Sequence, residues 1–192
     1  MRKLILLMCL VLLITEISQA AILTFDDITT GPILGYIPDD YGGFNWNSEW
    51  GIVSSSNNPG SGYDNGTVSG EYVAFNLYYD DVTITRDSVF DFQGVYLTAA
   101  WDNGLNITID GYLDSSLEYT TTVIVDTTGP TLFDLNYLGI DKLEFTAFGG
   151  TDAGLGGNGS YFAMDNFTFV PEPNTFALIS FGVVVLLKRI KK

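Results

Sequence analysis

Histidine is absent from the 192 residues of this chain, and cysteine occurs once, at position 9. The lack of histidine excludes a Ser-His-Asp triad, a Cys-His dyad and any metal site with a histidine ligand. Because Cys9 lies in a segment that we expect to be removed, the mature chain should contain no disulfide and no reactive thiol.

Basic residues are also scarce: 8 Lys and Arg stand against 23 Asp and Glu, a formal net charge of -15. Between Ala21 and Val170 there are 21 acids and two bases, Arg86 and Lys142. Such a surface repels phosphate backbones, which excludes a nucleic-acid-binding protein, and it attracts cations and basic partners. With 46% hydrophobic and only 16% charged residues, the chain is not disordered, and its length suits one domain.

The N-terminus has the three parts of a secretory signal peptide. Arg2 and Lys3 precede an apolar run over residues 4–14, which is too short for a comfortable membrane span, and small residues follow at positions 18 and 20. We predict a signal peptide over residues 1–20, with signal peptidase cutting between Ala20 and Ala21. An ordinary buried N-terminal helix is the alternative that the flanking charges disfavour.

The C-terminus carries a short motif, an apolar stretch and a basic end, in that order. The motif consists of Pro171, Glu172 and Pro173, the predicted transmembrane helix covers about residues 175–190, and Lys and Arg cluster at the last five positions. Residues 170–192 therefore resemble the PEP-CTERM sorting signal of Gram-negative bacteria. The resemblance implies an exosortase-type processing enzyme as partner and an organism that makes exopolysaccharide.

Together the two ends predict an exported protein. The basic cluster keeps the C-terminal end in the cytoplasm, while the signal peptide places everything before Pro171 outside. We expect an inner-membrane-anchored precursor and a mature form in the cell envelope or on the extracellular surface. A plain membrane anchor without processing is the alternative.

Residues 21–169 have the composition of strands, rich in Gly, Thr, Asp, Phe and Tyr. We predict an all-β ectodomain, a single antiparallel β-sandwich of jelly-roll-like architecture. Its first and last stretches, Leu23–Asp27 and Phe162–Phe169, also resemble the uncharacterised ectodomains that precede PEP-CTERM tails. Alternating patterns predict strands at residues 82–85, 105–110, 119–125, 142–148 and 162–169, and turn residues are expected at 64–66, 102–104, 110–111 and 128–130.

Aromatic residues between Tyr36 and Trp50 are the candidate sugar ligands. Tyr41, Trp46 and Trp50 lie among Gly, Asn and Asp, which predicts a loop or broken strand with exposed rings that could stack on sugars. The alternative is that these rings fill the core. We expect Trp101 and at least one other Trp to be buried.

A calcium site is predicted from the placement of acids at both ends of the domain. Asp26 and Asp27 follow the first predicted strand, and Asp165 and Asn166 interrupt the last. Neighbouring terminal strands would bring these four residues together, and Ca²⁺ prefers such oxygen ligands. The alternative is that they end strands or face solvent.

These features favour a non-enzymatic, structural or adhesive protein of the exopolysaccharide matrix. A carbohydrate-binding module is the alternative, with extracellular polysaccharide as partner, and a carboxylate-based glycoside hydrolase is a distant third. The adjacent pairs Asp26-Asp27, Asp39-Asp40 and Asp80-Asp81 cannot flank one bond, because neighbouring residues on a strand point to opposite faces.

Overall fold

The computed structural model of the protein describes residues 19–28, 35–77 and 81–171. Within it, Ala20–Pro171 form one compact unit. The predicted signal peptide up to residue 18, Glu172, Pro173 and the predicted helix over residues 175–190 lie outside the described residues. In the part of the chain that the structure describes, no helix is long and apolar enough to cross a membrane.

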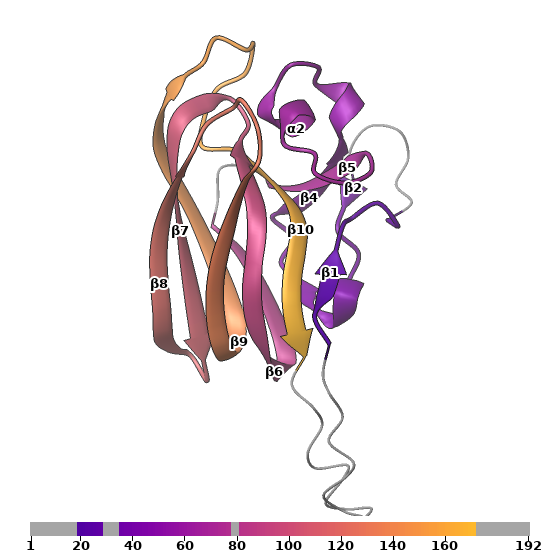
Figure 1. The fold of residues 1–192 in the computed structure, drawn as a ribbon, viewed down its shortest axis with the longest axis vertical. Helices are drawn as coiled ribbons and strands as arrows, with labels where there is room; N and C mark the ends of the chain where they lie inside the picture. Colours follow the sequence, from indigo (N-terminus) through magenta and orange to yellow (C-terminus); the bar gives the residue numbers. More distant parts are fainter. Residues whose placement is uncertain (1–18, 29–34, 78–80, 172–192) are drawn as a thin grey trace, which may run out of the picture. The chain divides into compact units, whose positions relative to one another are not determined.

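Among the described residues, ten strands paired in antiparallel fashion make up most of the unit (Figure 1). They are β1 (Ala21–Leu23), β2 (Gly35–Tyr36), β3 (Asn45–Trp46), β4 (Trp50–Ser54), β5 (Tyr72–Asn76), β6 (Val82–Ala99), β7 (Asp102–Leu113), β8 (Ser116–Val125), β9 (Thr131–Asp152) and β10 (Phe162–Pro171). Three single turns of helix join them: η1 (Tyr41–Gly43), η2 (Ser55–Asn57) and α2 (Gly62–Asn65).

The strands form two layers, and the long strands β6 and β9 each belong to both of them. Residues 90–99 of β6 pair with β10 and with residues 131–140 of β9, and the strand order continues through β5, β4 and β2. Residues 82–85 of β6 pair with β3 and with residues 142–145 of β9, which also pairs with β7. Register shifts in β6 between these two stretches mark the passage from one layer to the other.

One aromatic-rich core lies between the layers. Trp50 of the first layer contacts Phe145 of the second edge-on, with ring centroids 5.8 Å apart, and Phe145 stacks on Phe162 of β10 at 6.1 Å. The alternating apolar residues of β7, Leu105, Ile107 and Ile109, are fully buried against this core. The predicted all-β antiparallel sandwich is therefore confirmed.

A second, smaller cluster covers the opposite face of β4, β5 and β10. It contains Phe75 and Tyr63, whose rings meet edge-on at 5.3 Å, and half-buried Trp101 packs on it. Tyr63 comes from α2, which lies close against the end of β6. A Cβ added at Gly62 would overlap the carbonyl oxygen of Ala99, so this contact requires glycine.

The five predicted strands are confirmed, while some predicted turns are wrong. Residues 102–104 and 110–111 lie inside β7, and residues 64–65 belong to α2, which Gly66 ends. Gly104 keeps the positive φ of a turn residue, 69°, although it lies within β7, so the turn composition here marks an irregular start of a strand. The turn at residues 128–130 is confirmed between β8 and β9.

Candidate functional site

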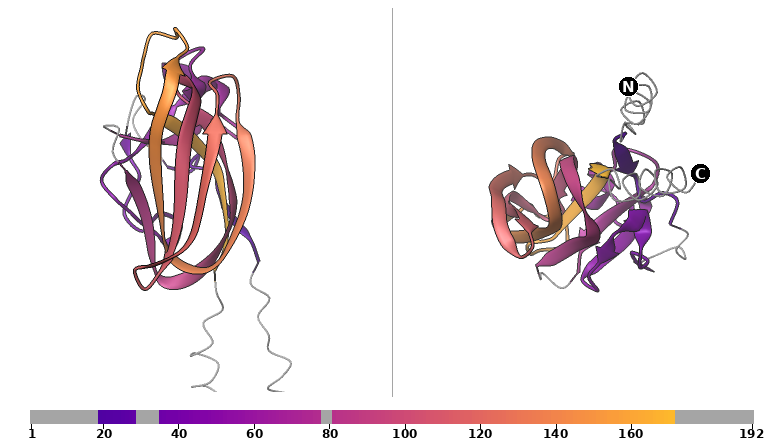
Figure 2. Two further views of the ribbon diagram at one scale, coloured as in Figure 1. Left: turned by 90° about the vertical axis from the view of Figure 1, so that its left-hand side faces the viewer. Right: turned by 90° about the horizontal axis from the view of Figure 1, so that it is seen from below.

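The outward side of the second layer is a polar surface built by three long strands, β7, β8 and β9. In Figure 2, left, β9, β7 and β8 run side by side. Because side chains alternate along a strand, the same three strands that bury Ile107, Val123 and Phe145 turn their other residues outward. We call this surface the β7–β9 face; its residues are Thr83, Asn106, Thr108, Asp110, Tyr112, Leu117, Thr120, Thr122, Ile124, Lys142, Glu144, Thr146 and Phe148.

Strand register arranges the face in rows across β8, β7 and β9. The first row is Ile124, Asn106 and Phe148, and the next is Thr122, Thr108 and Thr146. The hydroxyl groups of Thr108 and Thr122 lie 2.9 Å apart and hydrogen-bond, which confirms that both point to the same side. Rows of this kind present hydroxyl, amide and apolar groups on one side of the sheet.

The third row, Thr120, Asp110 and Glu144, and the fourth, Leu117, Tyr112 and Lys142, carry the charges. Lys142 Nζ lies 2.6 Å from Glu144 Oε2 and 4.5 Å from the centroid of the Tyr112 ring. Burial raises the pKa of the Tyr112 hydroxyl, Glu144 and Asp110 raise it further, and Lys142 opposes the shift. The ammonium of Lys142 is thus held by a carboxylate and a ring together.

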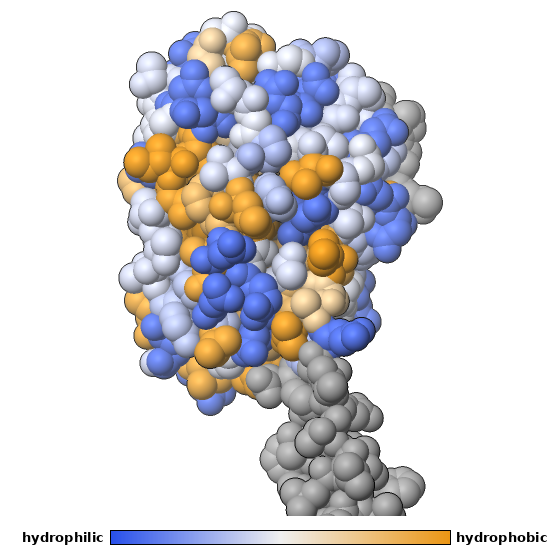
Figure 3. Space-filling model, viewed as in Figure 1, coloured by the Kyte–Doolittle hydropathy of each residue, from blue (hydrophilic) through white to orange (hydrophobic). Residues whose placement is uncertain are grey.

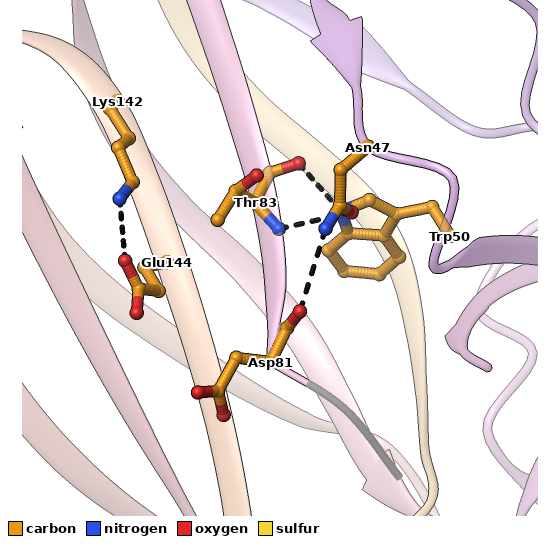
Figure 4. Close-up of polar contacts among 6 residues, drawn as sticks. All are labelled: Asn47, Trp50, Asp81, Thr83, Lys142 and Glu144. Atoms are coloured by element: carbon orange, nitrogen blue, oxygen red, sulfur yellow. Dashed lines mark hydrogen bonds and ion pairs between the residues drawn. The ribbon is translucent and has the colours of Figure 1, made fainter. Parts of the chain in front are cut away.

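Hydrogen bonds of the Asn47 side chain fix the edge of the β7–β9 face that lies next to β3. As Figure 4 shows, its side chain accepts a hydrogen bond from Thr83 N at 3.2 Å and donates one to the carbonyl of Asp81 at 3.5 Å. Trp50 Nε1 donates to the Thr83 carbonyl from within the core, at 3.1 Å. The start of β6, next to Glu144, is therefore fixed from both sides.

Trp46 and Trp50, the two tryptophans predicted to contact sugar, are buried. Trp46 is 6% exposed and Trp50 is 1% exposed, so neither ring can stack on a sugar, and the expectation of exposed rings at these two positions is wrong. Their indole N–H groups donate to the carbonyls of Tyr41 and Thr83, which permits burial. The predicted broken strand is confirmed, because the segment consists of β2, η1 and β3.

The other two aromatic predictions have mixed outcomes. Tyr41 is half-buried, and its hydroxyl donates to Asp27 Oδ1 at 2.7 Å and accepts from Phe25 N. Burial and the Asp27 bond raise its pKa. Trp101, expected in the core, is instead half-buried on the second cluster, where the Gly157 backbone covers its ring. Within the segment only Tyr36, 62% exposed on β2, has the predicted accessibility.

Of the four predicted calcium ligands, Asp26 and Asp165 interact electrostatically, and all four side chains or their neighbouring amides already take part in hydrogen bonds within the protein. β1 pairs with β10, so the terminal strands are neighbours as expected. Asp165 accepts hydrogen bonds from Val68 N, Ser69 N and Asn166 N, and Asp26 Oδ1 accepts from Glu71 N and Tyr72 N. Among the described residues no group of three or more acidic or thiol side chains gathers around one point. A calcium ion here stays a prediction.

The residues at the predicted processing sites frame the unit. Ala20 is exposed and Ala21 begins β1, while Pro171 ends β10 opposite Phe90. Both ends of the described unit therefore lie in paired strands next to each other.

Figure 3 shows one face of the molecule coloured by hydropathy. Hydrophobic groups gather on its left side, where Figure 1 draws β8 and β9. The first half of β9, outside the β7–β9 face, exposes Leu132 and Leu138, at 45% and 59%. Leucine lacks the flat ring that stacks on a sugar. Phe148, 47% exposed, offers such a ring on the β7–β9 face.

Sequence reasoning did not single out Asp110, Tyr112, Lys142, Glu144 or Phe148 as a site. Part of the signal was present, since alternation over residues 105–110 and 142–148 places polar residues on one side of each strand. The missing step was that β7 and β9 are neighbours, which only the fold shows.

No family model and no curated protein matches the chain. Solved structures that are similar include a carbohydrate-binding module, TmCBM61, in complex with β-1,4-galactotriose, with 11% identity, a TM-score of 0.43, and coverage of 72% of this chain and 99% of that chain. A second, described as CBM4 structure and function, has 15% identity, a TM-score of 0.34, and coverage of 64% and 86%. Likenesses this distant carry no argument about what the chain binds.

Proposed function

We propose that Ala20–Pro171 is a non-catalytic polysaccharide-binding domain of an exported matrix protein, with the β7–β9 face as its binding surface. The observation that carries the proposal is the order of the rows. Phe148 and Tyr112 lie six residues apart along the sheet, roughly 20 Å, and hydroxyl and carboxylate side chains fill the rows between them. A sugar chain requires a ring to stack on and polar groups that bind its hydroxyls; the exposed Phe148 supplies the ring, while the Tyr112 ring already contacts Lys142.

An adhesive role in the matrix follows from such binding, and the jelly-roll-like class remains our expectation for the sandwich. Hydrolysis is a weaker reading. Asp110 and Glu144 oppose each other on neighbouring strands, which adjacent acids in the sequence could not do. However, two hydrolytic carboxyl groups must enclose the glycosidic bond, and the Glu144 carboxylate is bound to Lys142 of its own strand.

Affinity electrophoresis of the Ala20–Pro171 unit in gels containing matrix polysaccharides tests the proposal. This unit contains both hydrophobic clusters, so we expect it to fold alone, and a cooperative melt serves as control. Phe148→Ala should abolish the retardation seen with the wild type. Leu138→Ala, which removes a similarly exposed side chain from the other half of β9, should not. A wild-type domain that no polysaccharide retards would refute the proposal.

The proposed location rests on the two ends of the chain. We infer that signal peptidase cleaves after Ala20 and that an exosortase-type enzyme reads Pro171, Glu172 and Pro173. This inference is supported by β10 ending at Pro171, the first residue of the motif. Glu172→Ala should leave a full-length precursor in the membrane fraction. Mature protein from the native host that still ends in Lys192, by mass spectrometry, would contradict processing.

A further inference from the structure

The charges on the β7–β9 face do not balance. Lys142 and Glu144 neutralise each other at 2.6 Å, which leaves Asp110 as the uncompensated charge. Its Oδ1 atom is buried and has no hydrogen-bond partner among the described residues. A partly buried carboxylate without a partner costs free energy that a cationic group bound beside it would offset.

The other base of the domain cannot serve Asp110. The Arg86 guanidinium lies over the rings of Phe44 and Phe169, at 5.1 and 5.3 Å from their centroids, and the charge that acts on it is that of Asp40. Neither base of the domain therefore pairs with Asp110, and a cation that balanced it would come from outside the domain.

Charge also limits which polysaccharides can approach. The stretch between Ala21 and Val170 contains 21 acids and two bases, so its field repels a polymer of uronic acids or sulfated sugars. Neutral and cationic polymers remain. Of these two, only a cationic polymer gains from the unbalanced Asp110.

Lys142 shows how this face holds an ammonium group. Its Nζ atom contacts the Glu144 carboxylate and lies over the Tyr112 ring, and Asp110 stands next to both residues in the register. An amino group on a sugar presents the same chemistry from the ligand side, because a primary ammonium offers three donors and a compact positive charge.

We propose that the polysaccharide bound by the β7–β9 face is an amino-sugar polymer with free, positively charged amino groups, one of which pairs with Asp110. This inference rests on the proposed function and names its ligand class. The amino group contributes a charge-assisted hydrogen bond, and the rows of threonine and the Phe148 ring contact the sugar backbone.

Hexasaccharides of glucosamine and of N-acetylglucosamine test the inference, because they share a backbone and differ in the amine charge. Binding is measured by calorimetry on the Ala20–Pro171 unit, at a pH where the amines are protonated, for the wild type, Asp110→Asn and Asp134→Asn. The last variant is the matched control, since Asp134 is an exposed acid on the first half of β9 with the same charge. Thermal melts confirm that each variant is folded.

We expect the wild type to bind the glucosamine hexamer more tightly than the acetylated one. Asp110→Asn should weaken binding of the glucosamine hexamer by about tenfold and leave the acetylated hexamer unaffected. Asp134→Asn should change neither. Equal losses in the two variants would show attraction by net charge alone and overturn the inference.

Different results would refute the amino-sugar inference and the proposed polysaccharide-binding function. If Phe148 is needed for binding a neutral polysaccharide but free amines give no preference, the amino-sugar inference is wrong and the proposed function stands. If no sugar of any charge binds, the proposed function fails as well.

Discussion

Asp165 is the residue that fastens the segment before β5 to β10. It is fully buried, and its carboxylate accepts hydrogen bonds from Val68 N at 2.7 Å, Ser69 N at 3.0 Å and Asn166 N at 2.7 Å. Burial raises its pKa to about 6, although the three backbone N–H groups oppose the shift. The Asp165 side chain thus holds the local backbone conformation and makes the stability of the fold depend on pH.

Replacing Asp165 by alanine should lower the free energy of unfolding at pH 7 by about 2–4 kcal/mol. The change leaves three backbone donors without their acceptor in a buried place. Asp134→Ala, which removes an exposed acid, should stay within about 0.5 kcal/mol of the wild type. Urea denaturation measures both, and equal midpoints would contradict this role of Asp165.

The stability difference between the wild type and Asp165→Ala should also depend on pH. The folded state binds the Asp165 proton more tightly than the unfolded state, whose pKa is 3.8, so this group stabilises the fold most below pH 4. That contribution falls by up to about 3 kcal/mol as the pH rises to about 6. The stability difference between wild type and Asp165→Ala should therefore shrink from pH 4 to pH 7. A difference that grows over this range would contradict the raised pKa.

Trp50 and Trp101 should differ in the opposite sense to their sequence-based prediction. Trp50 is 1% exposed and meets Trp46, Phe145 and Phe162 edge-on, so Trp50→Ala should cost about 3–5 kcal/mol. Trp101→Ala should cost clearly less, because its ring is half-buried outside the main core. Thermal melts of the two variants decide the order.

Polar neighbours caused the error at Trp46 and Trp50. Gly, Asn and Asp around them are typical of exposed loops, but here they make short strands and turns that bring both rings inward. Burial of an indole N–H depends on a carbonyl acceptor, and the one that serves Trp50 comes from β6, far along the chain. No local pattern contains that information.

At the level of elements, alternation located the strands but not their length. The predicted strands at residues 82–85 and 142–148 are parts of β6 and β9, which run over 18 and 22 residues. Each strand changes partners along its length and has bulges, so its apolar pattern shifts phase. In the sequence, a strand that belongs to two layers therefore has the pattern of a short strand followed by a loop. The β7–β9 face was missed for a different reason, because the sequence does not show that β7 and β9 are neighbours.

An aromatic contact also joins β8 to β9, although these two strands do not pair. Tyr119 of β8 stacks on Tyr137 of β9 with ring centroids 4.7 Å apart, and its hydroxyl donates to the Leu138 carbonyl. Gly111 makes room for the pair, because a Cβ there would lie 2.8 Å from Tyr137 Cδ2. The stack thereby links β8 and β9, two strands that do not pair with each other.

Gly111→Ala should lower stability by about 1–3 kcal/mol by pushing into this stack. Gly129→Ala is the matched control, since no atom lies within 4 Å of its added Cβ and its backbone is not strained. Near-ultraviolet circular dichroism of the tyrosines should change only in the first variant. If the two glycine variants melt together, the stack does not depend on Gly111.

At the scale of the whole molecule, acidic charge dominates. With 21 acids against two bases between Ala21 and Val170, the folded domain repels itself, and added salt screens that repulsion. Raising NaCl should therefore raise the melting temperature without any specific site. This background must be separated from the predicted calcium site.

Comparing CaCl2 with MgCl2 at equal concentration makes the separation, because the two salts screen equally. The calcium proposal predicts a higher melting temperature in Ca²⁺ than in Mg²⁺, since an ion that binds only the folded state stabilises it as its concentration passes the dissociation constant. That difference should vanish in Asp26→Ala and persist in Asp134→Ala. Asp26 also accepts hydrogen bonds from Glu71 N and Tyr72 N, so Asp26→Ala lowers the melting temperature in either salt, and only the difference between salts is informative. Equal melting temperatures in the two salts for the wild type would mean that Asp26 and Asp165 serve only to hold the backbone before β5.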